Sequence, residues 1–435
     1  MSEFDGNGAL EVARGERAII VVPELPRESA RRSAEARIDE AQGLAEAIGV
    51  VVTDARSFRV RSVRPATLLG KGQVEEIAEV ARAHEAKLLV VDSALTPVQQ
   101  KNLEEESKTK VIDRTGLILE IFGERAVTAE GRLQVELAHL DYQAGRLVRS
   151  WTHLERQRGG FGFLGGPGET QIEADRRMIR DRMARIRREL ERVKRTRTLH
   201  RGRRQRAPWP VVALVGYTNA GKSTLFNRLT GEAVFSEDLL FATLDPTMRD
   251  IRLPGLDKVI LSDTVGFVSD LPTELIAAFR ATLEEVASAD LIVHVRNMAH
   301  PDHDAQADDV ADVLASLGLD GEDSPPRLEA WNKIDLLAPD EREHLLGEAR
   351  RRDDVVPISA LTGEGLNQLK AAMAEHLRRD ERVHEFVVPA GAGERIAWLH
   401  SRGEVIEQSV DGDAMLIKVR LSADNFARFQ ASGDR

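Results

Sequence analysis

The chain has 435 residues, enough for two to four domains with well-formed cores. Hydrophobic residues make up 42% and charged residues 31% of it, a balance that is typical of folded globular proteins and excludes a disordered chain. The absence of cysteine excludes a disulfide framework and any thiolate metal site, and the formal net charge of −11 argues against nucleic-acid binding by the protein as a whole.

The N-terminus and the apolar runs give no sign of export or membrane insertion. The opening stretch, MSEFDGNGALEVARGER, is too acidic and polar for a secretory signal. The longest apolar runs, such as AIIVV and KLLVV, have the length of a strand and cannot span a bilayer. We therefore expect a cytoplasmic protein with no integral membrane association, acting as a monomer.

The first part of the chain alternates predicted strands and helices. Strands are predicted at 19–26, 49–55 and 87–93, and helices at 33–48 and 73–86. This alternation is typical of an α/β domain, which we expect to end near residue 128. The segment LGKGQ around Lys71 lacks the full spacing of a phosphate-binding loop, so we interpret it as a turn before a helix.

Two helical stretches around a glycine-rich loop come next. In both, apolar residues repeat at steps of three, four and seven, which places them on one face of a helix. The first set is Leu133, Leu137, Leu140, Leu147, Trp151 and Leu154, and the second is Ile172, Ile179, Met183, Ile186, Leu190 and Val193. The loop RGGFGFLGGPGET (158–170) is too rich in glycine to continue either helix, so an antiparallel helical hairpin is predicted.

Positive charge is concentrated in the second of these helices and in the segment KRTRTLHRGRRQR (194–206) that follows it. One interpretation is a solvated helix face laced with Glu–Arg pairs. Acidic partners thin out after Glu191, however, and this favours contact with an RNA backbone. That binding would be sensitive to salt, and replacing Arg201, Arg203 and Arg204 with glutamine would weaken it.

The stretch PVVALVGYTNAGKST has the spacing of a phosphate-binding loop, between a predicted strand and a predicted helix. Glycines let the backbone wrap a polyphosphate with its N–H groups pointing inward, and the helix presents its positive N-terminal end. Lys222 is expected to reach the β- and γ-phosphates, and the Ser223 hydroxyl to bind Mg²⁺. A glycine-rich turn with a chance lysine is the plain alternative, and the flanking elements disfavour it. The predicted phosphate-binding residues are Gly216, Tyr217, Thr218, Asn219, Ala220, Gly221, Lys222 and Ser223.

The tetrapeptide NKID indicates which base the nucleotide carries. A carboxylate at Asp335 can accept from both N1–H and the 2-amino group of guanine, whereas adenine presents an unprotonated N1 and no 2-amino group. A site built on such a pair discriminates strongly, because the wrong base leaves it unsatisfied. The segment VVPISAL is predicted to end as a strand whose last residues touch the base through backbone amides. The predicted base-binding residues are Asn332, Lys333, Ile334, Asp335, Ser359, Ala360 and Leu361.

Two segments between these motifs are expected to sense the γ-phosphate. In DTVGF, Asp263 can support Mg²⁺ through water and the Gly266 N–H can report the phosphate; Thr264 and Val265 complete this part of the site. In LLFATLDPTMRD, Thr243 and Thr247 are both candidates for a threonine that completes the Mg²⁺ shell only while the γ-phosphate is present.

The last segment, 383–435, is predicted as strand, helix, two strands and helix, a small α+β unit. The fold class that follows is α/β: a P-loop GTPase domain with an N-terminal α/β domain, an antiparallel helical hairpin and a small C-terminal α+β domain. The predicted boundaries are 1–128, 129–207, 208–380 and 381–435.

Several of these stretches together resemble HflX, the ribosome-associated GTPases of the Obg–HflX group. They are GPGETQIEADRR (166–177), LLGKGQVEEI (68–77), FATLDPT (241–247) and DTVGF (263–267), and the resemblance spans about residues 17 to 380. It implies that Thr243 is the threonine that binds the metal with Ser223. It also implies that the nucleotide is lined by Phe241, Ala242, Thr243, Leu244 and Asp245.

The resemblance implies a partner and a role as well: the large ribosomal subunit and its rRNA, approached by the hairpin, and the splitting or rescue of stalled ribosomes under stress. Two other functions stay open at this point. One is an RNA- or ribosome-binding adaptor whose nucleotide only tunes affinity, and the other is a tRNA-modifying GTPase.

The phenylalanine that ends DTVGF raises the question of catalysis, because a related hydrolase often carries glutamine there to orient water. Phe267 cannot polarise water, and the resemblance implies slow hydrolysis by the protein alone. Either a partner such as the ribosome supplies the missing group, or a K⁺ held by Asn219 adds positive charge beside the β–γ bridge. Asn219 as a plain turn residue is the alternative. The predicted catalytic residues are Lys222, Thr243, Gly266 and Asn219, with Mg²⁺ and K⁺ as the candidate ions.

Overall fold

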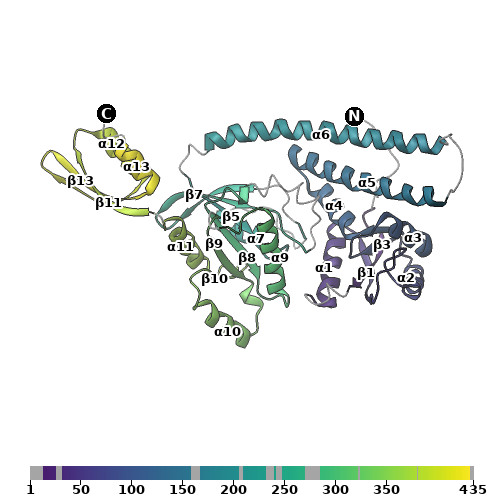
Figure 1. Ribbon diagram of the computed structural model, residues 1–435. Coiled ribbons are helices and arrows are strands. Elements are labelled where there is room, and N and C mark those ends of the chain that lie inside the picture. The colour runs from purple at the N-terminus through teal and green to yellow at the C-terminus, as the bar shows by residue number, and fades with distance from the viewer. Residues whose placement is uncertain are drawn as a thin grey trace.

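The computed structural model describes residues 13–25, 32–157, 167–204, 209–231, 240–241, 247–269, 285–321, 324–379 and 381–431. An N-terminal α/β unit lies beside the central sheet of the predicted GTPase domain, a long helical hairpin runs above both, and a small C-terminal unit projects from the far end (Figure 1). This is the predicted fold class. The exact domain boundaries stay a prediction.

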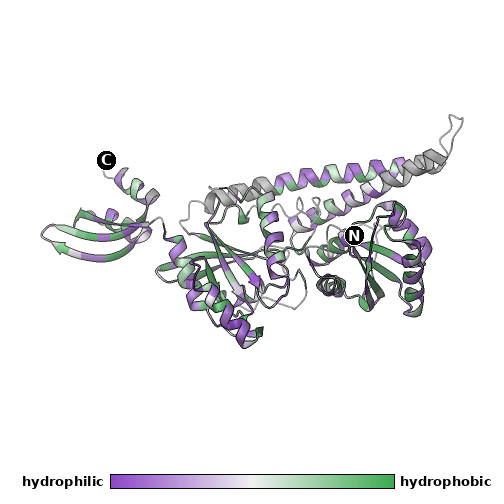
Figure 2. Ribbon diagram, turned by 60° about the horizontal axis from the view of Figure 1, so that its bottom comes forward, coloured by the Kyte–Doolittle hydropathy of each residue, from purple (hydrophilic) through white to green (hydrophobic). Residues whose placement is uncertain are grey.

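The N-terminal unit is built on four parallel strands in the order β2-β1-β3-β4. The strands are β1 (Arg17–Glu24), β2 (Val51–Arg59), β3 (Leu88–Val91) and β4 (Lys110–Asp113), and the helices are α1 (Ala34–Ala47), α2 (Lys71–Ala83), α3 (Pro97–Ser107) and α4 (Arg114–Arg125). The predicted strands and helices are all present. Strand β4 completes the sheet, and this strand and the helices α3 and α4 are not among the predicted elements. In Figure 2 the strands of this unit are largely hydrophobic, as expected for a parallel sheet covered on both faces.

Alternate residues of β1 enter two different cores, because successive side chains of a strand point to opposite faces. Ile19 and Val21 pack with α2 and α3 in one core. Ile20 packs with α1 and α4 in the other, and this second core continues into the GTPase domain, where it includes Phe267. The rings of Phe122 on α4 and Phe241 meet edge to face across this junction, with centroids 4.8 Å apart. The two units therefore share one apolar core.

The hairpin consists of α5 (Ala129–Gln157) and α6 (Pro167–Arg204), which pack against each other. The prediction that residues 158–170 form a loop is wrong at its end, because α6 begins at Pro167; proline is favoured in the first turn of a helix, where its missing N–H costs nothing. Met183 and Ile186 are buried as predicted. Among the described side chains of α5, Val135 and Ala138 are buried, since this helix also packs against α4, whereas the predicted Leu133, Leu137 and Leu140 are half-buried. The side chains of Leu147, Trp151 and Leu154 lie outside the described part.

The GTPase domain has a six-stranded sheet in the order β10-β9-β8-β5-β7-β6, parallel except for β6. Its strands are β5 (Val211–Val215), β6 (Thr247–Leu253), β7 (Leu256–Asp263), β8 (Leu291–Asn297), β9 (Arg327–Asn332) and β10 (Val355–Pro357). Its helices are α7 (Lys222–Thr230), α9 (His303–Ser316), the short η1 (Ile334–Leu336), α10 (Pro339–Ala349) and α11 (Leu366–Leu377).

The C-terminal unit follows the predicted order of strand, helix, two strands and helix. These are β11 (Glu381–Pro389), α12 (Gly393–Arg402), β12 (Glu404–Asp411), β13 (Ala414–Ser422) and α13 (Ala423–Ala431). The strands form an antiparallel sheet in the order β11-β13-β12. Among the described residues, none of the helices combines the length and the apolar character needed to cross a bilayer.

Candidate functional site

The phosphate-binding loop joins the end of β5 to the start of α7, and two of its glycines are required by their surroundings. Gly216 has φ +152°, and a Cβ there would lie 2.3 Å from the Val295 carbonyl oxygen. Gly221 has φ +93°, and a Cβ there would lie 2.2 Å from the Asn332 amide nitrogen. Any larger residue would push the loop off the strand or off the base-binding segment.

Lys222 lies in the first turn of α7 with its ammonium group turned back into the loop. Its Nζ donates to the carbonyl oxygens of Gly216 (3.0 Å) and Tyr217 (2.8 Å). Burial lowers the pKa of Lys222 to about 8, and the nearby carboxylate of Asp263 opposes that shift. A buried ammonium held at the mouth of a backbone loop is suited to the charge of a polyphosphate.

Ser223 and Asp263 supply a hydroxyl and a carboxylate next to the phosphate loop. The Ser223 Oγ donates to Asp263 Oδ2 at 2.9 Å, and Asp263 is buried at the end of β7. Within the described part of the chain, no cluster of three or more Asp, Glu, His or Cys residues forms a metal site. Hard oxygen ligands of this kind fit Mg²⁺, which keeps waters and binds substrate phosphates in such sites. Thr247 begins β6, paired with Asp263, while Thr243 lies outside the described residues.

The DTVGF segment packs directly on the phosphate loop. The Thr218 N–H donates to the Phe267 carbonyl (2.7 Å), and the Phe267 N–H donates to the Gly216 carbonyl (3.1 Å). These two hydrogen bonds leave out the N–H of Gly266, where a Cβ would lie 2.7 Å from Thr218 Cγ2 and 3.2 Å from Lys222 Nζ. Any side chain at position 266 would therefore collide with Thr218 of the phosphate loop and crowd the Lys222 ammonium group, so glycine is required there.

Side chains on both sides of Gly266 enter the protein interior. Thr264 is buried and its hydroxyl donates to the Leu214 carbonyl at 2.6 Å, and Val265 lies in the core shared with the N-terminal unit. Phe267 is 1% exposed in the same core. Its ring thus fills the interior, and DTVGF offers no polar side chain for the attacking water at this position.

The NKID segment follows β9 and is bonded to the phosphate loop. The Asn332 side chain donates to the Ala220 carbonyl (2.8 Å) and accepts from the Ala360 N–H (2.9 Å). The Lys333 Nζ donates to the Asn219 side-chain oxygen at 3.2 Å. One asparagine therefore joins the phosphate loop to both base-binding segments.

The remaining base-binding residues lie around this junction. Asp335 is half-buried within η1, and Ile334 beneath it is buried. Ser359 and Ala360 are buried, whereas the Leu361 side chain is 66% exposed. The NKID segment and the segment after β10 are joined through Asn332, which accepts from the Ala360 N–H, and guanine recognition by these residues stays a prediction.

Five residues proposed from the resemblance lie at or beyond the edge of what the structure describes. Ala242, Thr243, Leu244 and Asp245 are outside the described residues. Phe241 is described and is 2% exposed, with its ring against Phe122 in the shared core. Its side chain is therefore committed to the junction with the N-terminal unit, which leaves only its backbone for a nucleotide.

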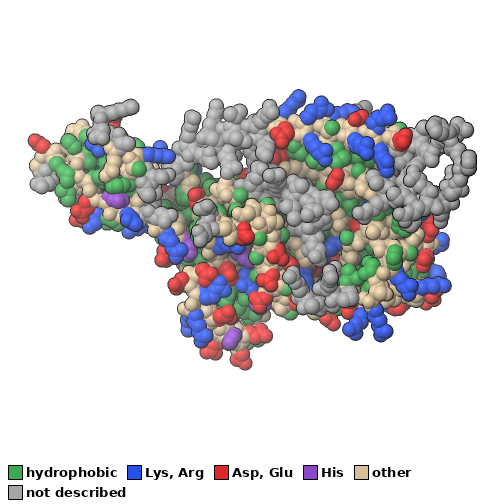
Figure 3. Space-filling model, in the orientation of Figure 1, with side chains coloured by type: hydrophobic (Ala, Val, Ile, Leu, Met, Phe, Trp, Pro, Cys, Tyr) green, Lys and Arg blue, Asp and Glu red, His purple; other side chains and the backbone are tan. Residues whose placement is uncertain are grey.

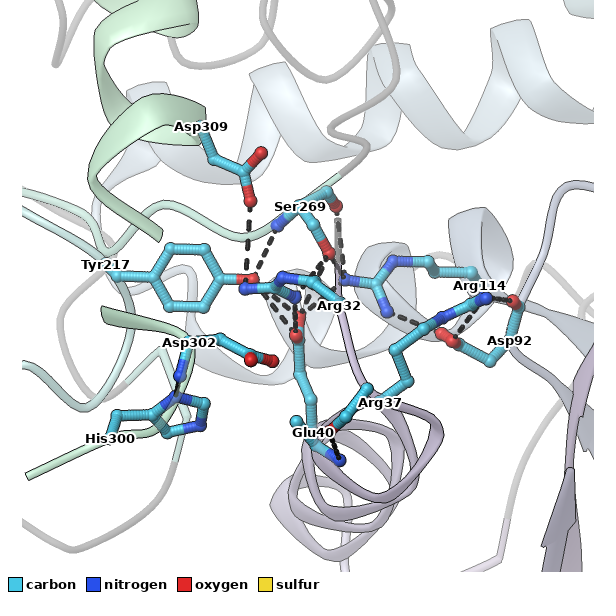
Figure 4. A network of polar contacts seen from close by, with 12 residues as sticks. Arg32, Arg37, Glu40, Asp92, Arg114, Tyr217, Ser269, His300, Asp302 and Asp309 are labelled. Atoms are coloured by element: carbon cyan, nitrogen blue, oxygen red, sulfur yellow. Dashed lines mark hydrogen bonds and ion pairs between the residues drawn. The ribbon is translucent and has the colours of Figure 1, made fainter. Parts of the chain in front are cut away.

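A buried polar network, which the sequence analysis missed, ties the nucleotide site to the N-terminal unit (Figure 4). The Tyr217 hydroxyl donates to Glu40 on α1 (2.9 Å) and accepts from the Ser269 N–H (2.8 Å), two residues beyond DTVGF. Arg114 on α4 donates to Ser269 Oγ (2.8 Å) and pairs with Glu40 (2.6 Å). One tyrosine of the phosphate loop thus contacts both the DTVGF end and the neighbouring unit.

Two arginines hold the central carboxylate of this network in its ionised form. Burial alone would raise the pKa of Glu40, but Arg114 and Arg32 outweigh it and lower that pKa to about 2. Because this pKa is below the unfolded value, Glu40 contributes stability at neutral pH that is lost as the pH falls from about 4.5 toward 2. No sequence pattern links Glu40 to Tyr217, which are 177 positions apart.

Replacing Glu40 with glutamine is expected to lower the free energy of unfolding by about 3–5 kcal/mol, because two buried guanidinium groups lose their counter-charge. Urea unfolding monitored by circular dichroism measures this change. Glu46→Gln, at an exposed position of the same helix, is the matched control and should cost under about 0.5 kcal/mol. Coinciding curves for the two variants would show that the network does not stabilise the junction.

The chain matches three models of known protein families. A family model described as "GTP-binding GTPase N-terminal" matches residues 35–123, one described as "GTP-binding GTPase Middle Region" matches residues 125–204, and one described as "50S ribosome-binding GTPase" matches residues 211–333. Together they span the N-terminal unit, the hairpin and the nucleotide site as far as NKID.

Full-length relatives give the family. The GTPase HflX of Magnetococcus marinus is 45% identical over 98% of this chain and 97% of its own, and that of Escherichia coli is 44% identical over 82% of each chain. A crystal structure of a GTP-binding protein from Sulfolobus solfataricus in complex with GDP covers 84% of this chain and 99% of its own, at 23% identity and a TM-score of 0.44. On the sequence relatives, the chain belongs to the HflX family of GTPases.

Proposed function

We propose that this GTPase acts on the large ribosomal subunit and uses its nucleotide cycle to split or rescue stalled ribosomes. The observation that carries the proposal is the hydrogen-bonded junction at Asn332, which joins a phosphate loop to a guanine-reading segment in one site. The partner rests on the family model of a 50S ribosome-binding GTPase over residues 211–333 and on the basic hairpin helix.

Nucleotide binding uses groups already described. The phosphate-loop N–H groups and Lys222 hold the phosphates, and the Asp335 carboxylate accepts from the guanine N1–H and 2-amino group. Ser223 would hold Mg²⁺, with Asp263 supporting it through water, and Thr243 is proposed as the threonine that completes the shell. The ion would supply positive charge that neutralises the phosphates. The Gly266 N–H, which the bridge to the phosphate loop leaves out, is proposed to bind the γ-phosphate.

Slow hydrolysis by the protein alone follows from the position of Phe267 in the core. A partner that orders the attacking water or supplies a cation is one way to accelerate the reaction. In other systems an arginine finger raises the hydrolysis rate by about 10³- to 10⁵-fold. A K⁺ beside Asn219 is the other. The Asn219 oxygen already accepts from Lys333, so a K⁺ would share that oxygen with an ammonium group or displace it.

Turnover in potassium chloride against sodium chloride separates these remedies. If Asn219 holds K⁺, the rate without ribosomes is expected to be higher in potassium and to lose that excess in Asn219→Ala. Purified subunits are then added in sodium chloride to measure the stimulation by a partner alone. Equal rates in both salts would remove the cation from the mechanism.

The hairpin offers a basic surface for rRNA. Arg182 on α6 is paired with Glu136 on α5 at 2.6 Å, so part of the charge is internal to the hairpin. Other arginines of the helix, among them Arg180, Arg185 and Arg187, are exposed. Figure 3 shows Lys and Arg side chains gathered along α6 on this face. Clustered arginines on one helix form the electrostatic footprint of an RNA contact.

Ribosome dissociation with GTP, compared with a non-hydrolysable analogue, tests the proposal against an adaptor role. We expect 70S particles to separate in the presence of GTP, as followed by light scattering, with repeated turnover only where GTP is hydrolysed. No separation with either nucleotide, despite binding to the subunit, would favour the adaptor whose nucleotide only tunes affinity.

A further inference from the structure

A second basic surface lies on the N-terminal unit, far from the hairpin helix in the sequence. We name residues 59–66 the arginine loop; it begins at the last residue of β2 and lies before α2. Arg59, Arg61 and Arg64 are all exposed. The residue between the first two, Val60, is 3% exposed and points into the core beneath α2. This alternation leaves the two arginines exposed on either side of a buried valine.

The arginine loop is held in place by hydrogen bonds at both ends. The Val60 N–H donates to the Glu24 carbonyl (3.0 Å), which continues the pairing with β1 past the end of β2. Arg64 and Leu68 exchange two backbone hydrogen bonds of 3.1 and 2.8 Å. The Gln99 side chain, buried on α3, donates to the Arg64 carbonyl at 3.2 Å. A surface segment with this support keeps its arginines in a fixed arrangement.

The three guanidinium groups of the loop form no ion pair within the part of the chain that the structure describes. Among the acidic side chains nearby, Glu76 pairs with Arg56 at 3.1 Å and Glu75 lies 3.7 Å from Lys71, whereas Glu24 of β1 is the register partner of Arg59. Elsewhere arginines are commonly matched with carboxylates, as at Arg32, Arg37, Arg114, Arg182, Arg296, Arg342 and Arg352. The loop therefore forms a locally positive surface on a protein whose net charge is −11.

We propose that the arginine loop binds the phosphodiester backbone of RNA, as a contact separate from that of α6. Arg59 is the last residue of β2 and Arg61 lies at a bend two residues on, with buried Val60 between them, so each arginine can meet a different phosphate of one strand. Guanidinium groups bind phosphate through paired N–H donors and carry the electrostatic part of RNA affinity. The inference rests on the proposed function, because the ribosome supplies the RNA.

The location of the loop keeps it accessible while the nucleotide site is occupied. It packs over the core formed with α2 and α3, whereas α1 and α4 cover the face that meets the GTPase domain. Figure 1 shows α2 and α3 on the side of the N-terminal unit away from that domain. An RNA contact here would therefore set the orientation of the N-terminal unit on the subunit.

The test is a triple variant of the full chain, Arg59→Gln with Arg61→Gln and Arg64→Gln, titrated with purified large subunits over a range of salt. Three lost phosphate contacts are expected to reduce the slope of log affinity against log salt by roughly 2 to 3, and the affinity at 0.1 M salt by on the order of 10²-fold. The control removes the same charge from the opposite edge of the sheet, through exposed Arg82→Gln, Lys87→Gln and Lys108→Gln, and keeps the wild-type slope.

A photocrosslinking amino acid at Val63, which is 53% exposed in the loop, identifies what the loop touches. A crosslink to rRNA supports the proposal. A crosslink to a ribosomal protein, no crosslink at all, or a triple variant with the slope of the control overturns it, while the proposed function stands as long as the wild type binds the subunit. If the wild type does not bind the subunit, the proposed function itself fails.

Discussion

Replacing Asp335 with alanine is expected to lower affinity for GTP by about 10²- to 10⁴-fold and to abolish the preference for guanine. The carboxylate makes two hydrogen bonds to the guanine edge, and bonds to a charged group contribute roughly 1.5–3 kcal/mol each. Titration with a fluorescent GDP, in competition with GTP and ATP, measures both effects. The exposed variant Asp340→Ala, five residues on, should bind as the wild type does.

A second variant separates lost recognition from a damaged site. In Asp335→Asn the side chain can donate to the 2-oxo group of xanthine, so the variant is expected to prefer xanthosine triphosphate. A site that collapsed would bind neither base. If Asp335→Ala kept its preference for guanosine over adenosine nucleotides, guanine would have to be read elsewhere.

Replacing Lys222 with methionine is expected to reduce the hydrolysis rate by on the order of 10²- to 10³-fold, the range seen when one charge-stabilising donor is lost from an active site. Methionine keeps most of the side-chain volume, so the phosphate loop should retain its fold. It loses the donor to the Gly216 and Tyr217 carbonyls and the cation that meets the phosphates. Single-turnover measurements with saturating GTP report the chemical step.

The matched control for Lys222 is Lys101→Met, at a side chain that is 72% exposed on α3. Its rate should equal that of the wild type, and circular dichroism of both variants shows whether either is unfolded. A Lys222→Met protein that folds and turns over normally would contradict the assignment of the phosphate loop.

How much was visible in the sequence depends on whether the information is local. The phosphate loop, NKID and the order of elements in the C-terminal unit are written in consecutive residues, and the structure places them as predicted. The turn predicted around Lys71 lies a few residues earlier, at 65–67, because α2 begins at Lys71 itself. The apolar face of α5 was assigned less well, because Val135 and Ala138 face a helix of another unit, which the period of α5 alone does not reveal.

The network around Tyr217 could not be predicted, for a physical reason. The network combines distant parts of the sequence: Glu40, Arg114 and Ser269. An isolated charged residue in a helix is most often a solvated surface group. Only packing of the two units brings the charges together and removes water from them. A single tyrosine inside a phosphate loop gives no local signal of a partner 177 positions away.

The shared core constrains how the N-terminal unit can move as the nucleotide changes. Phe122 and Phe241 lie at a seam rimmed by the charges of Glu40 and Arg114. Opening this interface would expose the aromatic rings to water and separate the buried ion pairs. A sliding motion that keeps the two surfaces in contact therefore costs less free energy. A fragment that ends before the phosphate loop would expose its apolar half of this interface to water, so we expect that fragment to aggregate.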